Sequence, residues 1–424
     1  MRMRKTAKGV VSIVAMTSIV ALALAGCSRE GGGGSGGDAS GGAAATSPGI
    51  TDTSITLGIT TPLTGATAGP GNCTVDGAKA YFGVKNAEGG IEFGDGKTRT
   101  VELKTYDDGY DPQKALANFQ QMVSDGVFAA GLGLGTPTNR AWREAAIDEG
   151  VPQVLVMTGD PLFSDRAESP EQLGLVPIYQ QEGGAFGELL ASDSTEHKVA
   201  ILSQNDDYGK GYVEGFKEAI SGASNITIVK ELTYEATDAS VDAQITELAS
   251  SGADVFFNAM SITPLVISSL QKAQALSWLP SWFLPSNTSS PTAILEPGGG
   301  AAFPGIYSVA FAQSPQSPAF QESDEGKAFL DAIAEYTTQD GVPAFPHCVW
   351  SWIGAATLDQ AFQKMEEPTR ESFMTALEGI TDYSAPFMLE GSVIDTTQDG
   401  KPAVSQVQVQ KYNGKGYATA ETFG

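Results

Sequence analysis

The chain has 424 residues, which is too long for one compact core and predicts two domains. Hydrophobic residues make up 41% and charged residues 18%, proportions that are typical of a soluble globular protein. A formal net charge of −25 gives a surface that repels nucleic acid and anionic lipid headgroups, so we expect no nucleic-acid partner.

The N-terminus has the layout of a secretory signal. Residues 1–9 carry four basic side chains and no acid, and residues 10–25 form an uncharged apolar run that is short for a membrane span. The run ends in Leu-Ala-Gly before Cys27, which resembles a bacterial lipobox. We therefore expect a lipoprotein signal peptide over 1–26 and a lipid such as palmitate on Cys27. Cleavage elsewhere, or an uncleaved anchor, is the alternative.

A stretch rich in Gly, Ser and Ala follows the lipobox over 27–49 and predicts a flexible tether. A lipid anchor followed by a tether would place the folded part at the outer face of the bacterial cytoplasmic membrane. The N-terminal lipid would then be the chain's only contact with the membrane.

Strands and helices are expected to alternate from residue 54 onward, as in an α/β protein. Near-continuous apolar runs predict buried strands, and apolar residues at helical spacing predict the helices between them. The strands are expected at 54–60, 100–107, 127–134, 151–157, 197–206, 226–234, 253–260 and 405–413. The helices are expected at 75–90, 111–126, 206–222, 238–252, 347–365 and 367–380, with one more after residue 311.

Three acids crowd one stretch at the end of the second predicted strand. Asp111 precedes Pro112, which predicts a helix N-cap with proline in the first turn, and Gly126 predicts the left-handed end of that helix. A calcium loop would need further oxygen ligands at loop spacing, but the chain enters a helix instead. We therefore interpret Asp107, Asp108 and Asp111 as turn and cap residues rather than as a metal site.

The sequence contains short matches to catalytic and cofactor-binding motifs, but none lies in the structural context that the motif requires. The G-x-S-x-G match at 33–37 lies in the tether, and the glycine-rich stretch 131–136 lacks both dinucleotide spacing and a P-loop lysine. The two histidines, His197 and His347, form no recognisable metal pattern with the cysteines. We expect no enzyme, no cofactor and no metal.

Cys73 and Cys348 remain once Cys27 is assigned to the lipid. An even pair in an oxidising compartment makes a disulfide plausible, with two free thiols as the alternative. Their separation in the sequence allows no local argument for either outcome.

Five stretches carry a resemblance to a known family. They are ITTPLTG (59–65), DGAKAYFGVKNAEGGI (76–91), YDDGYDPQKALANFQQMVSDGV (106–127), AAIDEGVPQV (145–154) and NDDYGKGYVEGFK (205–217). Together they resemble the type I periplasmic-binding-protein fold, specifically the leucine/isoleucine/valine-binding branch of solute receptors for ABC importers. The resemblance covers nearly all of residues 50–413.

The resemblance implies two Rossmann-like α/β lobes joined by a three-strand hinge, which close over a ligand in the cleft. Lobe 1 would comprise 50–178 plus 312–402, and lobe 2 would comprise 179–311 plus 403–424. The implied function is capture of a small polar solute and its delivery to ABC permease subunits, by a protein expected to be a monomer. A sensor that passes its closed state to a signalling partner is the alternative. A transcription factor of related fold would need an N-terminal helix-turn-helix, where this chain has a signal and a tether.

The resemblance also implies which residues line the cleft. Thr136 would grip a ligand carboxylate, completed by Met157 and Thr158, while Tyr208 would be a tyrosine of the second lobe. Pro70 and Gly71 would lie on the first cleft loop, where an aromatic wall common in the family is missing. The remaining wall would comprise Tyr179, Ser261, Ile262, Ser286 and Asn287.

Two further expectations follow from the resemblance. At the positions where amino-acid binders hold the ammonium with an acid, this chain has Tyr179 or Gln180 and Ser286 or Asn287, so no carboxylate is expected there. An amide, a urea-like solute, or an aromatic or aliphatic carboxylate would then suit the site better than an α-amino acid. Cys73 on the first cleft loop and Cys348 just before the facing helix would form a disulfide that fastens the cleft rim.

Overall fold

The computed structural model describes residues 46–423. The predicted signal peptide, Cys27 and most of the tether lie outside the described residues.

The first lobe is built on a six-stranded sheet in the order β2-β3-β1-β4-β5-β6. The strands are β1 (Ser54–Thr61), β2 (Ile91–Glu92), β3 (Thr98–Asp107), β4 (Ala129–Gly131), β5 (Gln153–Val156) and β6 (Gln172–Gly174). All neighbours pair in parallel except the edge pair β2 and β3.

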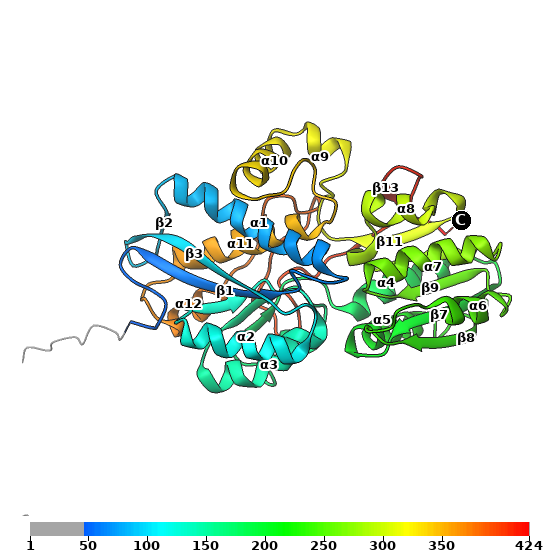
Figure 1. Cartoon of the computed structure of the whole chain (residues 1–424), viewed down its shortest axis with the longest axis horizontal. Coiled ribbons are helices and arrows are strands. Elements are labelled where there is room, and N and C mark those ends of the chain that lie inside the picture. Colours follow the sequence, from blue (N-terminus) through cyan, green and yellow to red (C-terminus); the bar gives the residue numbers. More distant parts are fainter. Residues whose placement is uncertain (1–45, 424) are drawn as a thin grey trace, which may run out of the picture. The chain divides into compact units, whose positions relative to one another are not determined.

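Helices cover both faces of this sheet (Figure 1). One face packs against α1 (Ala68–Ala87), α11 (His347–Lys364) and α12 (Arg370–Glu378), and α10 (Asp324–Tyr336) packs on α1 with α9 (Pro318–Glu322) beside it. The other face packs against α2 (Pro112–Ser124) and α3 (Thr136–Glu149), and the 3₁₀ turn η1 (Pro161–Ser164) follows β5. Because both faces are covered, the central strands are apolar on both sides, as the sequence predicts.

The second lobe repeats this plan with a seven-stranded sheet in the order β13-β12-β11-β10-β9-β7-β8. Its strands are β7 (His197–Gln204), β8 (Ile226–Tyr234), β9 (Val255–Ala259), β10 (Ser281–Phe283), β11 (Ile306–Ala310), β12 (Gln408–Tyr412) and β13 (Tyr417–Thr419). Its helices are α4 (Tyr179–Ser192), α5 (Asp207–Ala219), α6 (Asp242–Ala249), α7 (Thr263–Ala275) and α8 (Glu296–Gly298), with short turns η2 (Ser286–Thr288), η3 (Pro291–Leu295) and η4 (Gly300–Ala302).

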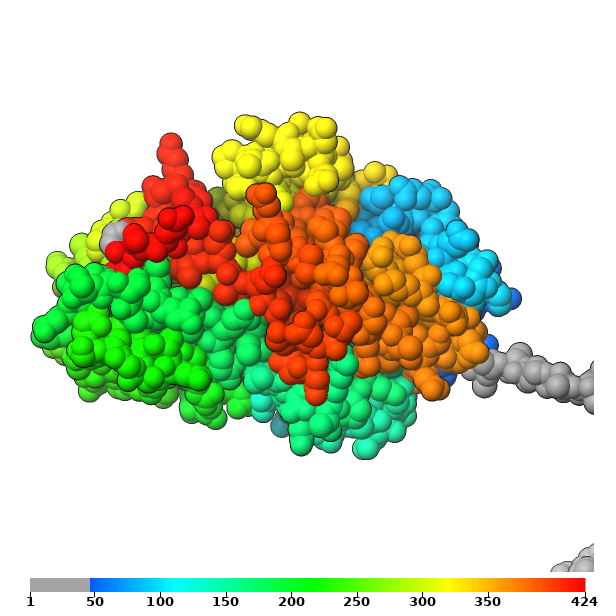
Figure 2. Space-filling model, turned by 180° about the vertical axis from the view of Figure 1, so that it is seen from behind, coloured from blue at the N-terminus to red at the C-terminus, as the bar shows by residue number. Residues whose placement is uncertain are grey.

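The chain passes between the two sheets after β6, after β11 and before β12. Two of these crossings lie side by side, because Val404 N donates to Leu175 O over 2.9 Å. Figure 2 shows the last part of the chain, orange to red, running across one face of the molecule towards the green second lobe. The lobe boundaries given above stay a prediction.

Most predicted elements are present, and two predictions on element bounds are wrong. Helix α1 begins at Ala68, so Pro70, Gly71 and Cys73 lie in its first turns and not on a loop. Proline is tolerated there because the first N–H groups of a helix have no intrahelical partner. Cys348 is the second residue of α11, in agreement with the helix expected at 347–365, and does not lie just before that helix as the resemblance implied.

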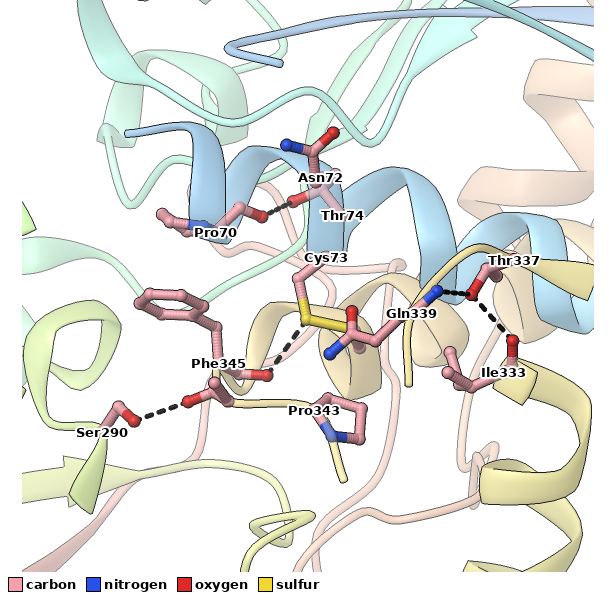
Figure 3. The surroundings of a disulfide bond; sticks show 12 residues. Pro70, Asn72, Cys73, Thr74, Ser290, Ile333, Thr337, Gln339, Pro343 and Phe345 are labelled. Carbon is pink, nitrogen blue, oxygen red and sulfur yellow. Dashed lines mark hydrogen bonds between the residues drawn. A yellow bond between two sulfur atoms is a disulfide. The ribbon is translucent and has the colours of Figure 1, made fainter. Parts of the chain in front are cut away.

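Helices α1 and α11 approach each other closely at Gly77. A Cβ atom at Gly77 would lie 2.0 Å from the carbonyl oxygen of Cys348, so only glycine fits. The predicted disulfide between Cys73 and Cys348 is present at this contact, with a Cα–Cα distance of 4.5 Å. Figure 3 shows Cys73 on α1, with the carbonyl oxygen of Phe345 3.2 Å from its sulfur. The disulfide thus joins the first turns of two helices.

The acids after β3 are turn and cap residues, as predicted. Asp107 accepts hydrogen bonds from the backbone N–H groups of Leu63, Thr64 and Gly109 and from the Thr64 hydroxyl. Asp111 caps α2, and Gly126 follows that helix with a φ of 68°. The carboxylates therefore join the loop after β1 to the loop after β3.

Asp111→Ala is expected to lower the free energy of unfolding by about 1 kcal/mol. The carboxylate accepts from Gln113 N over 2.8 Å and from Lys114 N over 3.4 Å, and alanine leaves both donors without this partner. Chemical denaturation would measure the loss. Asp111→Ser is the matched control, since serine restores a capping oxygen; equal losses in the two variants would contradict the capping role.

Candidate functional site

A small cavity of about 40 Å³ lies where the two lobes meet. This volume is far below the range of small-molecule sites, so a solute could enter only with the lobes further apart. Residues from the first lobe and the preceding crossing are Thr67, Pro70, Tyr110, Leu134, Gly135, Thr136, Met157, Val176, His347 and Trp350. Residues from the second lobe are Tyr179, Glu182, Tyr208, Tyr212, Ser261, Ser286 and Asn287. The lining thus combines four tyrosines and a tryptophan with apolar side chains, further hydroxyl groups and one carboxylate.

Three hydroxyl groups meet in a triangle at one side of this cavity. Thr136 Oγ1 lies 2.9 Å from Thr158 Oγ1 and 2.8 Å from Tyr179 Oη, and Thr158 Oγ1 lies 3.0 Å from Tyr179 Oη. The two threonines begin α3 and follow β5, at the carboxyl edge of the first sheet where parallel-sheet ligands bind. The tyrosine begins α4 of the other lobe, so the triangle joins the two lobes.

The expectation that the second lobe offers no carboxylate is wrong, because Glu182 lines the cavity. Its Oε1 accepts from Ser286 Oγ over 2.9 Å, and its Oε2 accepts from Tyr212 Oη over 2.8 Å and from Ser286 N over 3.1 Å. Burial raises the pKa of Glu182 to about 7, although these three donors oppose the shift. The acid is therefore poised between its neutral and charged forms near neutral pH.

The sequence analysis looked for an acid only at the positions that the resemblance indicated, and so it missed Glu182. Glu182 lies three residues after Tyr179 on α4, and residues at this spacing share one helix face. No helix was expected over 179–192, so the sequence prediction did not show that Glu182 lies on the same face as Tyr179.

Tyr110 reaches the cavity from the loop that the three acids organise. Its backbone N–H donates to Asp108 Oδ1 over 2.8 Å, and its φ of 65° is rare for a residue with a side chain. Asp108 also accepts from Thr60 Oγ1 over 3.0 Å, and burial raises the pKa of Asp108 to about 6. The turn chemistry thus positions an aromatic ring at the cavity, and the ring also packs against the core of the second lobe.

A family model that matches most of the chain shows which family this protein belongs to. Residues 54–417 match the family model described as periplasmic binding protein. The chain belongs to the periplasmic binding protein family. The type I fold predicted from the sequence is confirmed by solved structures that superimpose on nearly the whole of this periplasmic binding protein.

Three relatives illustrate the range of the family. Leu/Ile/Val-binding protein homolog 3 of Brucella melitensis is 30% identical over 213 residues, which make up 48% of this chain and 53% of that protein. A branched chain amino acid ABC transporter protein from Thermus thermophilus with bound valine has a TM-score of 0.76 at 14% identity, over 88% of this chain and 97% of that chain. A fatty acid ABC transporter substrate-binding protein from Thermomonospora curvata has a TM-score of 0.75 at 22% identity, over 89% of this chain and 94% of that chain.

These comparisons limit which properties of the relatives can be assigned to this chain. This periplasmic binding protein spans about half the length of the curated relatives it matches, and the two solved structures show the fold alone. The relatives are named as binding proteins, one of them of an ABC transporter, and not as enzymes. Within residues 46–423, no helix has the length and apolar character that a membrane span requires.

The cavity brings together most of the residues singled out from the sequence. Those that line it are Pro70, Thr136, Met157, Tyr179, Tyr208, Ser261, Ser286 and Asn287. Thr158 lies just behind them in the hydroxyl triangle. Gly71 does not line the cavity; a Cβ atom there would lie 1.9 Å from Pro62 O, so this glycine permits close backbone packing. Ile262 is buried in the core of the second lobe.

The sequence reasoning missed several lining residues besides Glu182. They are Thr67, Tyr110, Leu134, Gly135, Val176, Tyr212, His347 and Trp350. Tyr212 lies four residues after Tyr208 on α5, so helical spacing could have found it. No local signal identifies His347 or Trp350, because α11 comes from a distant part of the chain.

Proposed function

We propose that this chain is the solute-binding component of an ABC importer, held to the outer face of the cytoplasmic membrane by a lipid on Cys27. It would capture a small solute of branched-chain amino-acid type, or a similar carboxylate or amide, between its two lobes and deliver it to the permease unchanged. The proposal rests on the cavity between the lobes, whose hydroxyl triangle and single carboxylate are polar groups set in an aromatic wall.

Closure over the solute would exchange one set of hydrogen bonds for another. The hydroxyl of Tyr179 bonds both threonines of the triangle, which are the groups assigned to a ligand carboxylate. A solute carboxylate at that position would take the place of the tyrosine hydroxyl and accept the threonine protons. Polar contacts between the lobes, such as Arg140 with Asp207 at 2.9 Å, would help to hold the closed form.

Glu182 reopens the question of an α-amino acid ligand. A buried ammonium group needs a charged or hydrogen-bonding partner, and the Glu182 carboxylate in the cavity wall would provide one. An ammonium close by would favour the charged form of Glu182 against its raised pKa. The two solved relatives named for valine and for a fatty acid show that this fold carries ligands with and without an ammonium group.

A solute panel tests the proposed function. Thermal-shift measurements and calorimetry with valine, leucine, benzoate, hexanoate, isovaleramide and urea should reveal at least one solute that stabilises the protein, by about 2.7 kcal/mol at 100 times its Kd. Nuclear magnetic resonance of the solute after incubation should show it unchanged. Binding of none of these solutes, or conversion of one to a product, would contradict the proposal.

Glu182→Gln separates the two ligand classes. The amide keeps the size and hydrogen-bonding capacity of the side chain but cannot become negative. Binding of valine or leucine should weaken by at least about tenfold in this variant, while binding of benzoate or hexanoate should stay within about threefold. Equal losses for both classes would show that Glu182 does not distinguish them.

A further inference from the structure

His347 is a buried polar residue of the cavity wall that the rest of the protein leaves without hydrogen bonds. It is the first residue of α11 and is 1% exposed. Among residues 46–423, neither its Nδ1 nor its Nε2 has a hydrogen-bond partner. Buried polar groups in folded proteins are nearly always paired, so a ring with two unpaired nitrogens beside a cavity points to a partner that enters the cavity.

The position of this ring is fixed from several sides. Its centroid lies 4.4 Å from that of Trp350, one helical turn further along α11 and also in the cavity wall. The next residue, Cys348, is bonded to Cys73 of α1, whose first turn contributes Pro70 to the same wall. Since packing and the disulfide hold the ring, it meets a solute in a defined orientation.

The chemistry of the ring indicates which group it would recognise. Burial lowers the pKa of His347 to about 3, so the imidazole is neutral at physiological pH, with one nitrogen that donates and one that accepts. A neutral donor suits the oxygen of a carboxylate or an amide. The adjacent indole of Trp350 offers a flat apolar surface to the remainder of such a solute.

We infer that His347 is a specificity-determining residue of the solute site, whose ring N–H donates a hydrogen bond to a carboxylate or amide oxygen of the solute while Trp350 packs against its apolar part. The inference rests on the proposed function and names a contact within it. It also assigns a recognition role to α11, which the family resemblance did not supply.

Two substitutions test the contact. His347→Phe keeps a flat ring without a donor and should weaken binding of the best solute in the panel by about tenfold, while His347→Gln should retain part of the affinity. The melting temperature of the protein without solute should not fall in His347→Phe, because an unpaired polar ring is replaced by an apolar one. A ring with a merely structural role predicts the opposite pattern, with lower stability and unchanged affinity, and that result would overturn the inference.

The second histidine provides the matched control. His197 lies on β7 and contacts Asp193 and Asp254 at 2.9 and 2.8 Å, and it does not line the cavity. His197→Gln should therefore leave the affinity for the solute unchanged. The chain has two histidines, so ring-labelled histidine gives two signals, which the variants assign.

Nuclear magnetic resonance on the wild-type protein tests the contact between His347 and the solute even if a variant fails to fold. The best solute of the panel should move the ring signals of His347 and leave those of His197 in place. A solute that binds without moving the His347 signals would overturn the inference and leave the proposed function intact. Failure of all panel solutes to bind would overturn both.

Discussion

Replacing both Cys73 and Cys348 with serine is expected to lower the free energy of unfolding by about 4 kcal/mol. The disulfide joins residues 275 apart in the sequence, so it closes a long loop in the unfolded chain and removes much of that chain's conformational freedom. Guanidinium unfolding followed by circular dichroism should show a lower midpoint for the double variant than for the oxidised wild type.

The reduced wild-type protein is the matched control for this experiment. It has the native side chains but lacks the covalent link, so its midpoint should move close to that of the double variant. Cys73→Ser alone should lose the same stabilisation, because one cysteine cannot form the bond. Mass spectrometry of non-reduced peptides that finds two free thiols, or a wild-type midpoint insensitive to reductant, would contradict the prediction.

Local chemistry explains why much of the fold could be predicted from the sequence. Asp111 with Pro112 defines a helix start through hydrogen bonds within four residues, and β8 has the bounds expected from the sequence, 226–234. The start of α1 was missed because Gly69, Pro70 and Gly71 are typical of loops. Tertiary contacts override that preference, since the close approach of Gly71 to Pro62 O requires glycine.

The site residues that were predicted correctly are those that the family resemblance indicated. Thr136, Thr158 and Tyr179 do come together, but their mutual hydrogen bonds depend on how two lobes meet, which no local pattern encodes. Glu182 was missed because the helix that places it on one face with Tyr179 was not predicted. His347 could not be predicted, because its burial arises from packing between α1 and α11, which are far apart in the chain.

Glu182→Gln is expected to change how the stability of the protein depends on pH. Burial raises the pKa of Glu182 from 4.5 to about 7, so between these values the folded protein holds a proton that the unfolded chain has released. Raising the pH through this window therefore favours the unfolded chain, and above pH 7 the charged, buried form costs about 3 kcal/mol. Glutamine stays neutral and avoids this cost.

The three hydrogen bonds can survive the substitution. The amide oxygen can take the place of Oε2 and accept from Tyr212 and from Ser286 N, and the amide N–H can donate to Ser286 Oγ, which accepts as readily as it donates. The variant should therefore match the wild type in stability near pH 4 and exceed it by about 3 kcal/mol at pH 8, measured by denaturant unfolding without solute.

Comparing the two proteins at each pH isolates Glu182 from the other titrating groups. Asp108, with a pKa of about 6, and His347, with a pKa of about 3, are present in both proteins, so their contributions cancel in the difference. Glu188→Gln is the matched control, since Glu188 is exposed on the same helix; this variant should follow the wild-type curve. A stability difference between Glu182→Gln and wild type that is the same at pH 4 and pH 8 would show that Glu182 is charged to the same extent in the folded and unfolded chains.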